Sequence, residues 1–337
     1  MTGPVHDALG SSETSVVRLG VIGAGIMGDA VARSASVLPG FTVTAVADTD
    51  VARATALAEE LGAEAFHDFT ALLSSGLVDA VYIGVPHHLH LAACLEAASA
   101  RVHVLVDKPL CNSEDEAEAI ESAARESGTT WMVGLSYRFR AEWRRARDLI
   151  AAGRIGEPIA IFDVITEAAA KTPAWYWDPL SGGGVLQLQS HHSFDRIAWL
   201  TGRSVREVSC SLSEPVSRSA TAAQITASLE GGVLVGIALS FGTTYSAPVH
   251  AIFVLQGTTG QLEITHDGRV TLSTSEDGLV ESFGGDDWLG RELVEFASAI
   301  RQGATSTATI VDGHVALRCA LAAAQSATTG ERVTVAA

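Results

Sequence analysis

One lysine in this sequence of 337 residues lies where proton chemistry could take place. The run "VHVLV" (102–106) is typical of a buried strand, and it ends abruptly in Asp107, Lys108 and Pro109. Pro109 favours an extended backbone at Lys108, which helps to aim the lysine side chain. A partly buried lysine amine can act as a general acid or base near neutral pH. Lys108 is therefore the first candidate for a catalytic residue.

Two adjacent histidines form the second candidate. In "GGGVLQLQSHHSFDRIAWLTG" (182–202) glycines stand at both ends, which predicts a helix between them. His191 and His192 would point about 100° apart on that helix, so only one can face a given wall of a cleft. Asp195 lies four residues after His191 and three after His192, so it can share a face with either. The spacing alone does not choose between them.

A glycine-rich turn, "GAGIMG", follows the first apolar run of the chain. Its glycines permit a tight bend, a close approach of the backbone to a pyrophosphate, and close packing of helix on strand. The N-terminus of the following helix offers free N–H groups to phosphates. We therefore expect this turn to bind a dinucleotide through Gly23, Gly25, Ile26, Met27 and Gly28.

Asp48 bears on the choice of cofactor. It ends the second predicted strand, 20 residues after Gly28, where an acid should meet the ribose hydroxyls of the adenosine. A carboxylate there repels a 2′-phosphate, and neither Thr49 nor Asp50 offers a positive charge. We expect NAD to be preferred. NADP stays possible because Arg53, one turn further on, could tolerate the extra phosphate.

In the first half of the chain, strand patterns alternate with helix patterns. This alternation predicts a parallel sheet with crossover helices, and these elements must position the residues named above. Ligands of such sheets lie beyond the carboxyl ends of the strands. "GVPHHLH" and "DKPL" each follow a strand, so Lys108 is expected near the nicotinamide. The strands are predicted at 16–23, 41–48, 64–66, 79–84, 101–106 and 130–134.

After Gly134 the pattern changes to alternating apolar segments joined by glycine turns, which predicts antiparallel strands. Such a sheet can pack one face on helices and offer the other to a partner subunit. The fold class is therefore an α/β N-terminal Rossmann domain plus an α+β C-terminal domain with a large, mainly antiparallel open sheet. We expect a flexible tail at 1–15, a dinucleotide-binding domain at 16–135, and a substrate-binding and oligomerisation domain at 136–337.

Composition excludes several classes of protein. A formal net charge of −17 argues against a nucleic-acid surface, and no apolar run is long enough to cross a membrane. The first fifteen residues lack the features of a signal peptide, so a cytoplasmic protein is expected. Four scattered cysteines suggest packed, reduced thiols. The histidines of "HHLH" (87–90) have no cysteine or carboxylate cluster beside them, so no metal is expected.

These motifs resemble the Gfo/Idh/MocA family of NAD(P)-dependent oxidoreductases, which includes glucose–fructose oxidoreductase and inositol dehydrogenases. The resemblance covers nearly the whole chain. It implies an open C-terminal sheet that mediates homodimers or homotetramers, and a polyhydroxylated small-molecule substrate such as a sugar, glycoside or cyclitol. It is carried by "RLGVIGAGIMG", "AVADTDVARATALAEELG", "PHHLHLAACLEAASARVHVLVDKPL", "RARDLIAAGRIGEP", "SGGGVLQLQSHHSFDRIAWLTG" and "RELVEFASAIRQG".

The resemblance also implies roles for residues. The Glu-Lys-Pro signature of the family appears here with Asp107 in place of the glutamate, and Lys108 would handle the proton of the reacting hydroxyl. His192 would be the catalytic histidine, but Leu188 stands where the family has an acid, so that relay cannot be carried over whole. The remaining cofactor contacts would be Pro86, His90 and Asp107. Substrate contacts would be Lys108, Arg138, Tyr176, Gln189, His191, His192 and Asp195.

The function expected from these residues is hydride transfer between a nicotinamide cofactor and a secondary alcohol, with Lys108 and His192 handling the proton. A natural-product or amino sugar is possible, because an acidic chain would tolerate a cation. Two alternatives stay open. One is an NAD-dependent glycosidase of the same family that has no net redox change. The other is a non-enzymatic sensor that binds NAD(H).

Overall fold

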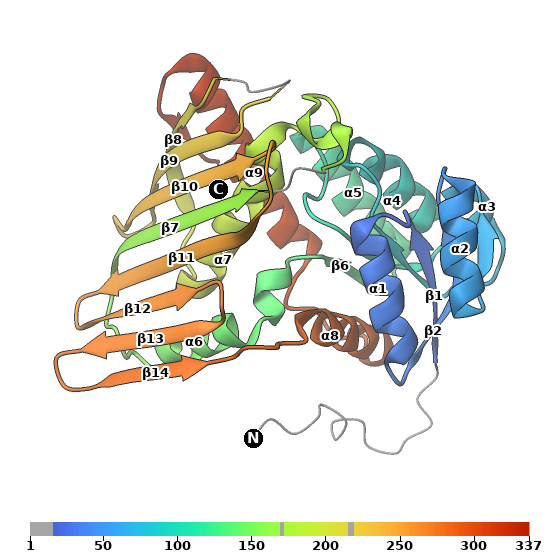
Figure 1. Ribbon diagram of the computed structural model, residues 1–337, viewed down its shortest axis with the longest axis horizontal. Coiled ribbons are helices and arrows are strands. Elements are labelled where there is room, and N and C mark those ends of the chain that lie inside the picture. The colour runs from blue at the N-terminus through green and yellow to red at the C-terminus, as the bar shows by residue number, and fades with distance from the viewer. Residues whose placement is uncertain (1–15, 169–171, 215–218, 337) are drawn as a thin grey trace.

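The computed structural model describes residues 16–168, 172–214 and 219–336, so the predicted tail at 1–15 lies outside the described residues. Two sheets with separate apolar cores organise the described chain (Figure 1). The predicted boundary between residues 135 and 136 stays a prediction. No helix among the described residues is long and apolar enough to cross a membrane.

The first sheet is parallel, with the strand order β3-β2-β1-β4-β5-β6. All six predicted strands are present. The order reverses between β1 and β4, which places a crevice at the carboxyl ends of these strands. The strands are β1 (Val17–Ile22), β2 (Phe41–Ala47), β3 (Glu64–Phe66), β4 (Ala80–Ile83), β5 (His103–Val106) and β6 (Trp131–Val133).

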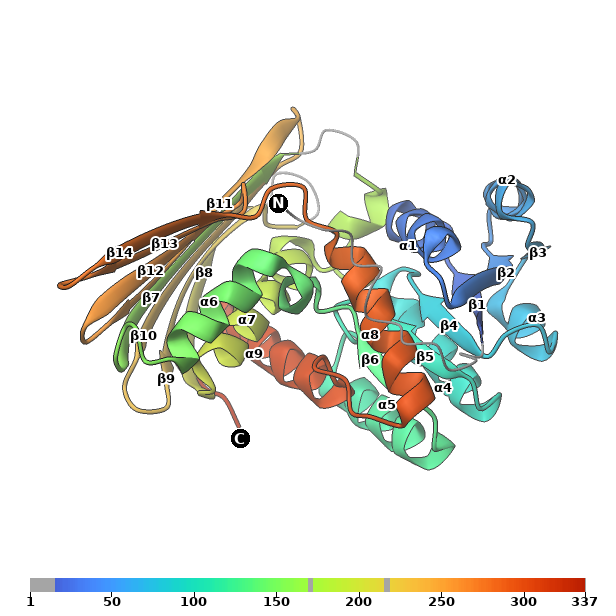
Figure 2. The same cartoon turned by 90° about the horizontal axis from the view of Figure 1, so that it is seen from below.

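Helices cover both faces of this sheet, as Figure 2 shows. Local signals begin several of them: Asp50, Asp68 and Ser113 each accept a hydrogen bond from the first turn of the helix that follows. The helices that connect the strands are α1 (Ile26–Val37), α2 (Val51–Leu61), α3 (Phe69–Ser74), α4 (His90–Ser99) and α5 (Glu114–Ser127), with the 3₁₀ turn η2 (His87–Leu89) before α4.

The second sheet has the order β14-β13-β12-β11-β7-β10-β9-β8-β15 and is antiparallel except for the β7–β10 pair. The glycine turns expected between the strands include Gly231–Gly232, which joins β9 to β10, and 257–260, which joins β11 to β12. The strands are β7 (Pro158–Ala168), β8 (Val205–Leu212), β9 (Ala222–Leu229), β10 (Leu234–Gly242), β11 (Ala247–Gly257), β12 (Gly260–Thr265), β13 (Arg269–Thr274), β14 (Gly278–Ser282) and β15 (Val333–Thr334).

Helices lie on only one face of the second sheet in the described chain (Figure 2). The other face leaves Phe162 54% and Leu234 65% exposed. This bare face is where the sequence predicts a partner subunit, and that oligomer stays a prediction. The elements on the covered side and at the domain junction are η3 (Ser136–Phe139), α6 (Ala141–Ala151), η4 (Ala174–Trp177), η5 (Leu186–Ser190) and α7 (His191–Thr201).

The last two helices tie the two sheets together. They are α8 (Trp288–Gln302) and α9 (Ile310–Thr329); the sequence predicts two helices from Asp286 to Ala327, and the second ends two residues later. In α8, Leu293 and Phe296 belong to the first core, although the residues come from the second half of the chain. In α9, Leu317 packs in the first core and Cys319 in the second. The relative position of the domains is therefore set by shared apolar burial.

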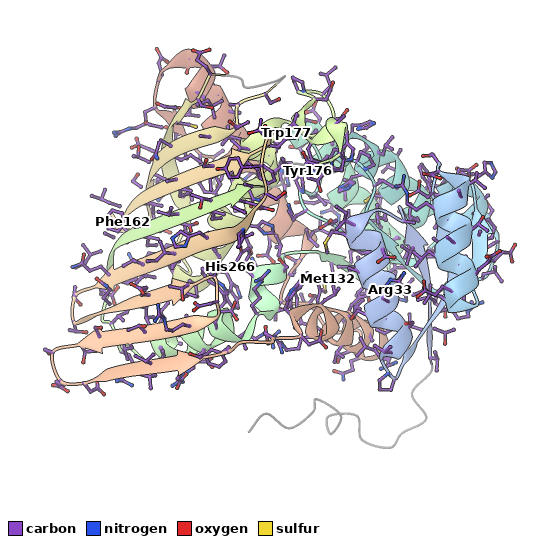
Figure 3. All side chains as sticks on the ribbon, in the orientation of Figure 1. Arg33, Met132, Phe162, Tyr176, Trp177 and His266 are labelled. Carbon is purple, nitrogen blue, oxygen red and sulfur yellow. The ribbon has the colours of Figure 1, made fainter. Side chains whose placement is uncertain are left out.

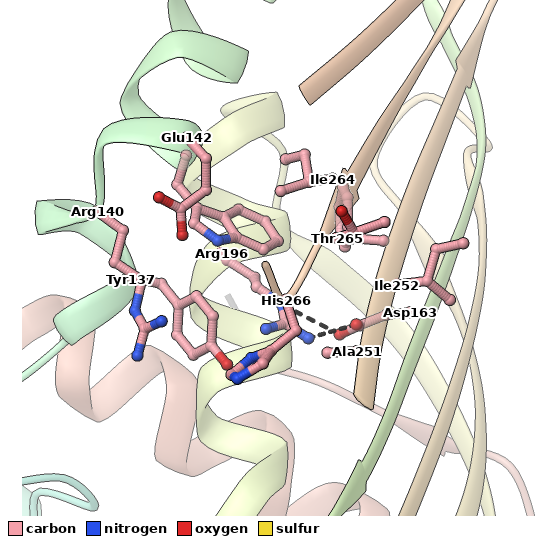
Figure 4. Close-up of a pocket in the computed structure, with 12 residues that line it drawn as sticks. Tyr137, Arg140, Glu142, Asp163, Arg196, Ala251, Ile252, Ile264, Thr265 and His266 are labelled. Carbon is pink, nitrogen blue, oxygen red and sulfur yellow. Dashed lines mark hydrogen bonds and ion pairs between the residues drawn. The ribbon is translucent and has the colours of Figure 1, made fainter. Parts of the chain in front are cut away.

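A buried ion pair joins α7 to the inner face of β7. Arg196 donates to Asp163, and both side chains are almost completely buried (Figure 4). The Arg196 guanidinium also lies 4.6 Å from the centre of the Tyr137 ring and 4.9 Å from that of Trp143. The small cavity beside this pair holds about 10 Å³, which is room for about one water molecule. It is a packing feature and is too small for a substrate.

We predict that Asp163→Asn lowers the free energy of unfolding by about 3–5 kcal/mol, because it leaves the Arg196 guanidinium buried without its counter-charge. Urea denaturation followed by circular dichroism measures the change. Glu207→Gln is the matched control: its partner Arg332 is 68% exposed, so the cost should stay below about 1 kcal/mol. Equal costs for the two variants would contradict the assigned importance of the buried pair.

Candidate active site

A cleft between the two domains has a volume of about 760 Å³, within the usual range for cofactor and ligand sites. The first domain contributes the glycine turn and the residues after β2, β4 and β5. The second contributes side chains from β7, β10 and the segments before α7. In Figure 3, Tyr176 lies where the second sheet approaches the first domain.

The glycine turn has the geometry that a dinucleotide requires. Gly23 has a φ of +93°, and a Cβ there would lie 2.6 Å from the carbonyl oxygen of Gly84. A Cβ at Gly28 would lie 1.8 Å from the carbonyl oxygen of Gly23, so helix and strand pack too closely for any side chain. Gly25 faces open space at the N-terminus of α1. The backbone there is free to approach a phosphate.

Asp48 lines the cleft beside the glycine turn, where we expect the adenosine. One carboxylate oxygen accepts a hydrogen bond from the Ala24 N–H at 2.8 Å, and the other accepts one from the Asp50 N–H at 2.8 Å. The Arg53 guanidinium lies 3.4 Å from the Asp48 carboxylate. Ile26 and Met27 also line this end. These residues fit a dinucleotide, with the pyrophosphate over α1 and the adenosine ribose against Asp48.

Pro86 and His90 lie on the loop after β4. Pro86 lines the cleft beside the 3₁₀ turn η2. His90 is fully buried, and its ring nitrogens lie 2.9 Å from the carbonyl oxygens of Pro109 and Val85. Its ring therefore braces the loop after β4 against the loop after β5, which carries Lys108. The direct contact with the cofactor that we expected for His90 stays a prediction.

Lys108 extends from the end of β5 across the cleft. Its Nζ donates a hydrogen bond to the Leu188 carbonyl oxygen at 2.9 Å, and its backbone N–H donates to Asp107 Oδ1 at 2.8 Å. Burial lowers the pKa of Lys108, and the charges of Asp107 and then Glu167 oppose that change. A lysine in this environment can release and accept a proton closer to neutral pH than an exposed lysine can.

The tertiary structure chooses between the two histidines. His192 lines the cleft, and its ring packs against the edge of Tyr137 at 5.0 Å. Its Nδ1 is buried and has no hydrogen-bond partner among the described residues. Burial, and then the charge of Lys108, lower the pKa of His192 well below its usual value, so the ring is neutral at neutral pH. His191 points elsewhere, with Nε2 2.8 Å from Gln187 Oε1.

Three predicted substrate contacts do not line the cleft: Arg138, His191 and Asp195 are at least 94% buried. The Arg138 guanidinium donates to Asp195 at 3.0 Å, pairs with Asp312, and also donates to the Thr307 carbonyl oxygen. Asp195 therefore faces Arg138 on η3 and not the histidine that spacing suggested. This network holds α7 against η3 and the start of α9, which positions the helix that carries His192.

A π-helical turn, Leu186–Ser190, precedes α7. The side chain of Leu188 packs in the second core. The carbonyl oxygen of Leu188 accepts the hydrogen bond from Lys108 Nζ. Gln189 lines the cleft, and its Nε2 donates to Glu167 Oε2 at 2.9 Å. Tyr176 lines the cleft as well, beside the Trp175 ring at 4.4 Å.

Sequence reasoning missed two acids of the cleft. Glu167, at the end of β7, was visible only as one more residue of an alternating strand. Glu292 is 3% exposed, and its Oε1 has no hydrogen-bond partner within the described residues. The sequence feature that could have indicated Glu292 is its position four residues before Phe296, which places its charge on the apolar face of α8. Among the described residues no three His, Cys, Asp or Glu side chains are grouped as metal ligands would be.

Comparison with known proteins agrees with this geometry. Residues 17–135 match the model of an oxidoreductase family with an NAD-binding Rossmann fold. Residues 143–263 match the model of the GFO/IDH/MocA C-terminal domain. The chain belongs to the Gfo/Idh/MocA family of oxidoreductases. The resemblance found in the sequence and the predicted fold class are both confirmed.

Relatives match over almost their whole length. A D-xylose 1-dehydrogenase (NADP(+)) of Haloferax volcanii is 29% identical over 92% of this chain and 98% of its own. An inositol 2-dehydrogenase of Pseudarthrobacter chlorophenolicus is 28% identical over 96% of this chain and 97% of its own. A levoglucosan dehydrogenase, solved in complex with NADH and levoglucosan, superimposes with a TM-score of 0.88 at 18% identity, over 96% of this chain and all of its own. That likeness shows the shared fold.

We predict that Gly25→Ala weakens NADH binding by about tenfold or more without changing the thermal midpoint, because the new methyl meets nothing in the protein but lies where a phosphate would approach. NADH fluorescence titration and a thermal melt measure both quantities. Gly284→Ala is the matched control, since its Cβ also meets nothing within 4 Å and lies outside the cleft. Unchanged NADH affinity in Gly25→Ala would contradict the assigned phosphate position.

Proposed function

We propose that this protein is an NAD(P)-dependent dehydrogenase that interconverts a secondary alcohol and a ketone on a sugar, glycoside or cyclitol. The observation that carries the proposal is the convergence of Lys108, His192 and the glycine turn on one cleft. The names of the relatives support the substrate class, since they act on xylose and inositol. Tyr176, Trp175 and Phe241 line the same cleft and offer aromatic faces to the C–H faces of a sugar ring.

The residues of the cleft divide the work. When bound, the nicotinamide accepts or returns the hydride. Lys108 takes the proton of the reacting hydroxyl, and its burial makes the neutral amine more accessible. His192 is neutral and has an open Nδ1, so it can share that proton or hold the substrate oxygen. Lys108 and His192 are both partly buried in the cleft, so its walls shield these groups from bulk water.

The test is NADH formation by the purified protein with NAD⁺ across inositols, pentoses, hexoses, methyl glycosides and aminoglycosides. We predict that Lys108→Met lowers kcat by roughly 10²–10⁴-fold, because it removes the proton acceptor, while the affinity for NADH stays within about threefold. His88→Gln is the control, since His88 is an exposed residue of the same region. Full activity in Lys108→Met would contradict the role of the lysine. Release of a leaving group without net NADH would indicate the redox-neutral glycosidase instead.

We also propose that NAD is preferred over NADP. Asp48 supports this preference, because its charge repels a 2′-phosphate, although Arg53 stands close by. We predict that Asp48→Ser raises the affinity for NADPH relative to NADH by about tenfold or more, since it removes the repulsion and one of the two carboxylates that pair with Arg53, the other being Asp50 at 3.0 Å. Titration with both reduced cofactors measures the ratio. In Asp48→Ser/Arg53→Gln part of the gain should be lost, and a gain that persists in full would contradict the role of Arg53.

A further inference from the structure

We propose that Glu167 is the carboxylate of the reaction site: it accepts a hydrogen bond from a substrate hydroxyl beside the reacting carbon, and its charge acts on Lys108, which lines the same cleft. The first part rests on the proposed function. The second part concerns the free protein and can be tested without substrate.

The fold aims Glu167 into the cleft. Along β7 the side chains alternate, and Ile161, Asp163 and Ile165 are buried on the face that α7 covers. Glu167 continues this inner face at the carboxyl end of the strand, opposite Phe241 of β10. Glu167 is half-buried there and lines the cleft. β7 thus brings a carboxylate to the substrate side of the cleft.

The carboxylate is held in place but keeps acceptor capacity. Glu167 Oε2 accepts one hydrogen bond from Gln189 Nε2 at 2.9 Å. Within the described residues no protein donor contacts Oε1. An ionised carboxylate can accept about four hydrogen bonds, so most of its capacity is available to a ligand. Polyols present adjacent hydroxyl donors that match such an acceptor.

Two carboxylates, Asp107 and then Glu167, act on the charge of Lys108, and neither comes from the segment before His192. The Leu188 side chain is buried in the core, and only its carbonyl oxygen meets Lys108 Nζ. Asp107 and Glu167 favour the ammonium form of Lys108. The other titratable groups around it are imidazoles that burial keeps neutral, and the phenol of Tyr176, whose pKa burial raises. These imidazoles are His87, His191 and His192.

The other carboxylates that line the cleft either accept backbone N–H groups or are buried. Asp48 and Asp68 lie at the adenosine end, where each accepts backbone N–H groups. Asp107 accepts the N–H of Lys108. Glu292 is 3% exposed, and burial raises its pKa well above the usual value, which favours the neutral acid. Among the described residues that line the cleft, Glu167 is the one carboxylate contributed by the second sheet.

In the oxidation, the carbon–hydrogen bond of the carbinol breaks as the hydride leaves, and the hydroxyl proton passes to neutral Lys108. Glu167 forms and breaks no covalent bond. It orients the neighbouring hydroxyl and stabilises the ammonium that Lys108 becomes after taking the proton. Removal of its charge should therefore weaken substrate binding and lower the pKa of Lys108.

The first test measures that pKa directly. The chain has two lysines, Lys108 and Lys171, so Lys171→Arg leaves a single lysine signal. In protein labelled with ¹³Cε-lysine, an NMR pH titration reports the pKa of Lys108. Glu167→Gln should lower the pKa of Lys108. Glu118→Gln makes the same charge change at an exposed position of α5 outside the cleft, and it should leave that pKa unchanged. An unchanged midpoint in Glu167→Gln would overturn the electrostatic role.

The second test is kinetic. Oxidation rises with pH as Lys108 loses its proton, so in Glu167→Gln this rise should begin at lower pH. KM should increase roughly 10- to 100-fold, as expected for one hydrogen bond to a charged acceptor, with NADH affinity unchanged. Glu167→Asp should restore the pH profile better than KM, because it keeps the charge but shortens the reach. Wild-type values of both KM and pH profile in Glu167→Gln would overturn the proposal.

Two further measurements distinguish failure of this proposal from failure of a variant to fold and from failure of the proposed function. Thermal melts establish that each variant folds, and Glu167→Met serves as a second neutral variant if Glu167→Gln does not. If wild-type protein turns over no polyol, the proposed function fails, but the NMR titration still decides whether Glu167 acts on Lys108.

Discussion

The hydrogen bond from Lys108 Nζ to the Leu188 carbonyl oxygen joins the two halves of the reaction site. Lys108 belongs to the first sheet and Leu188 to the second core, so this contact exists only when both domains are folded and docked. The shared helices α8 and α9 keep the domains in that position. Burial at this junction lowers the pKa of Lys108, so the docking of the domains also tunes the amine that we propose as the proton acceptor.

Interactions outside the cleft hold the elements that make this contact in position. His90 braces the loop that carries Lys108, while the Arg138–Asp195 network and the Asp163–Arg196 pair fix α7, which carries His192. Buried ion pairs of this kind cost desolvation, and their geometry is what makes them tolerable. Here they fix the direction of a helix whose position determines which histidine faces the substrate.

Membership of the Gfo/Idh/MocA family describes the scaffold, and the site must still be argued from its own residues. This chain has Leu188 at the position where an acid was expected from the resemblance, and the structure turns that side chain into the core. A carboxylate nevertheless reaches the cleft, from the neighbouring strand β7. A site can therefore keep a carboxylate even when the expected sequence position holds none, because side chains from different elements can line the same cleft.

The sequence by itself determined the local features: the six parallel strands, the glycine turn that admits no side chain at Gly23 or Gly28, and the position of Lys108 after a buried strand. These follow from short-range periodicity and backbone sterics. Only the tertiary structure decided which of His191 and His192 faces the cleft, that Asp195 pairs with Arg138, and that Glu167 enters the site. Each of these depends on the packing of segments tens of residues or more apart in the chain, and helical or strand spacing carries no information about which distant surface a side chain will meet.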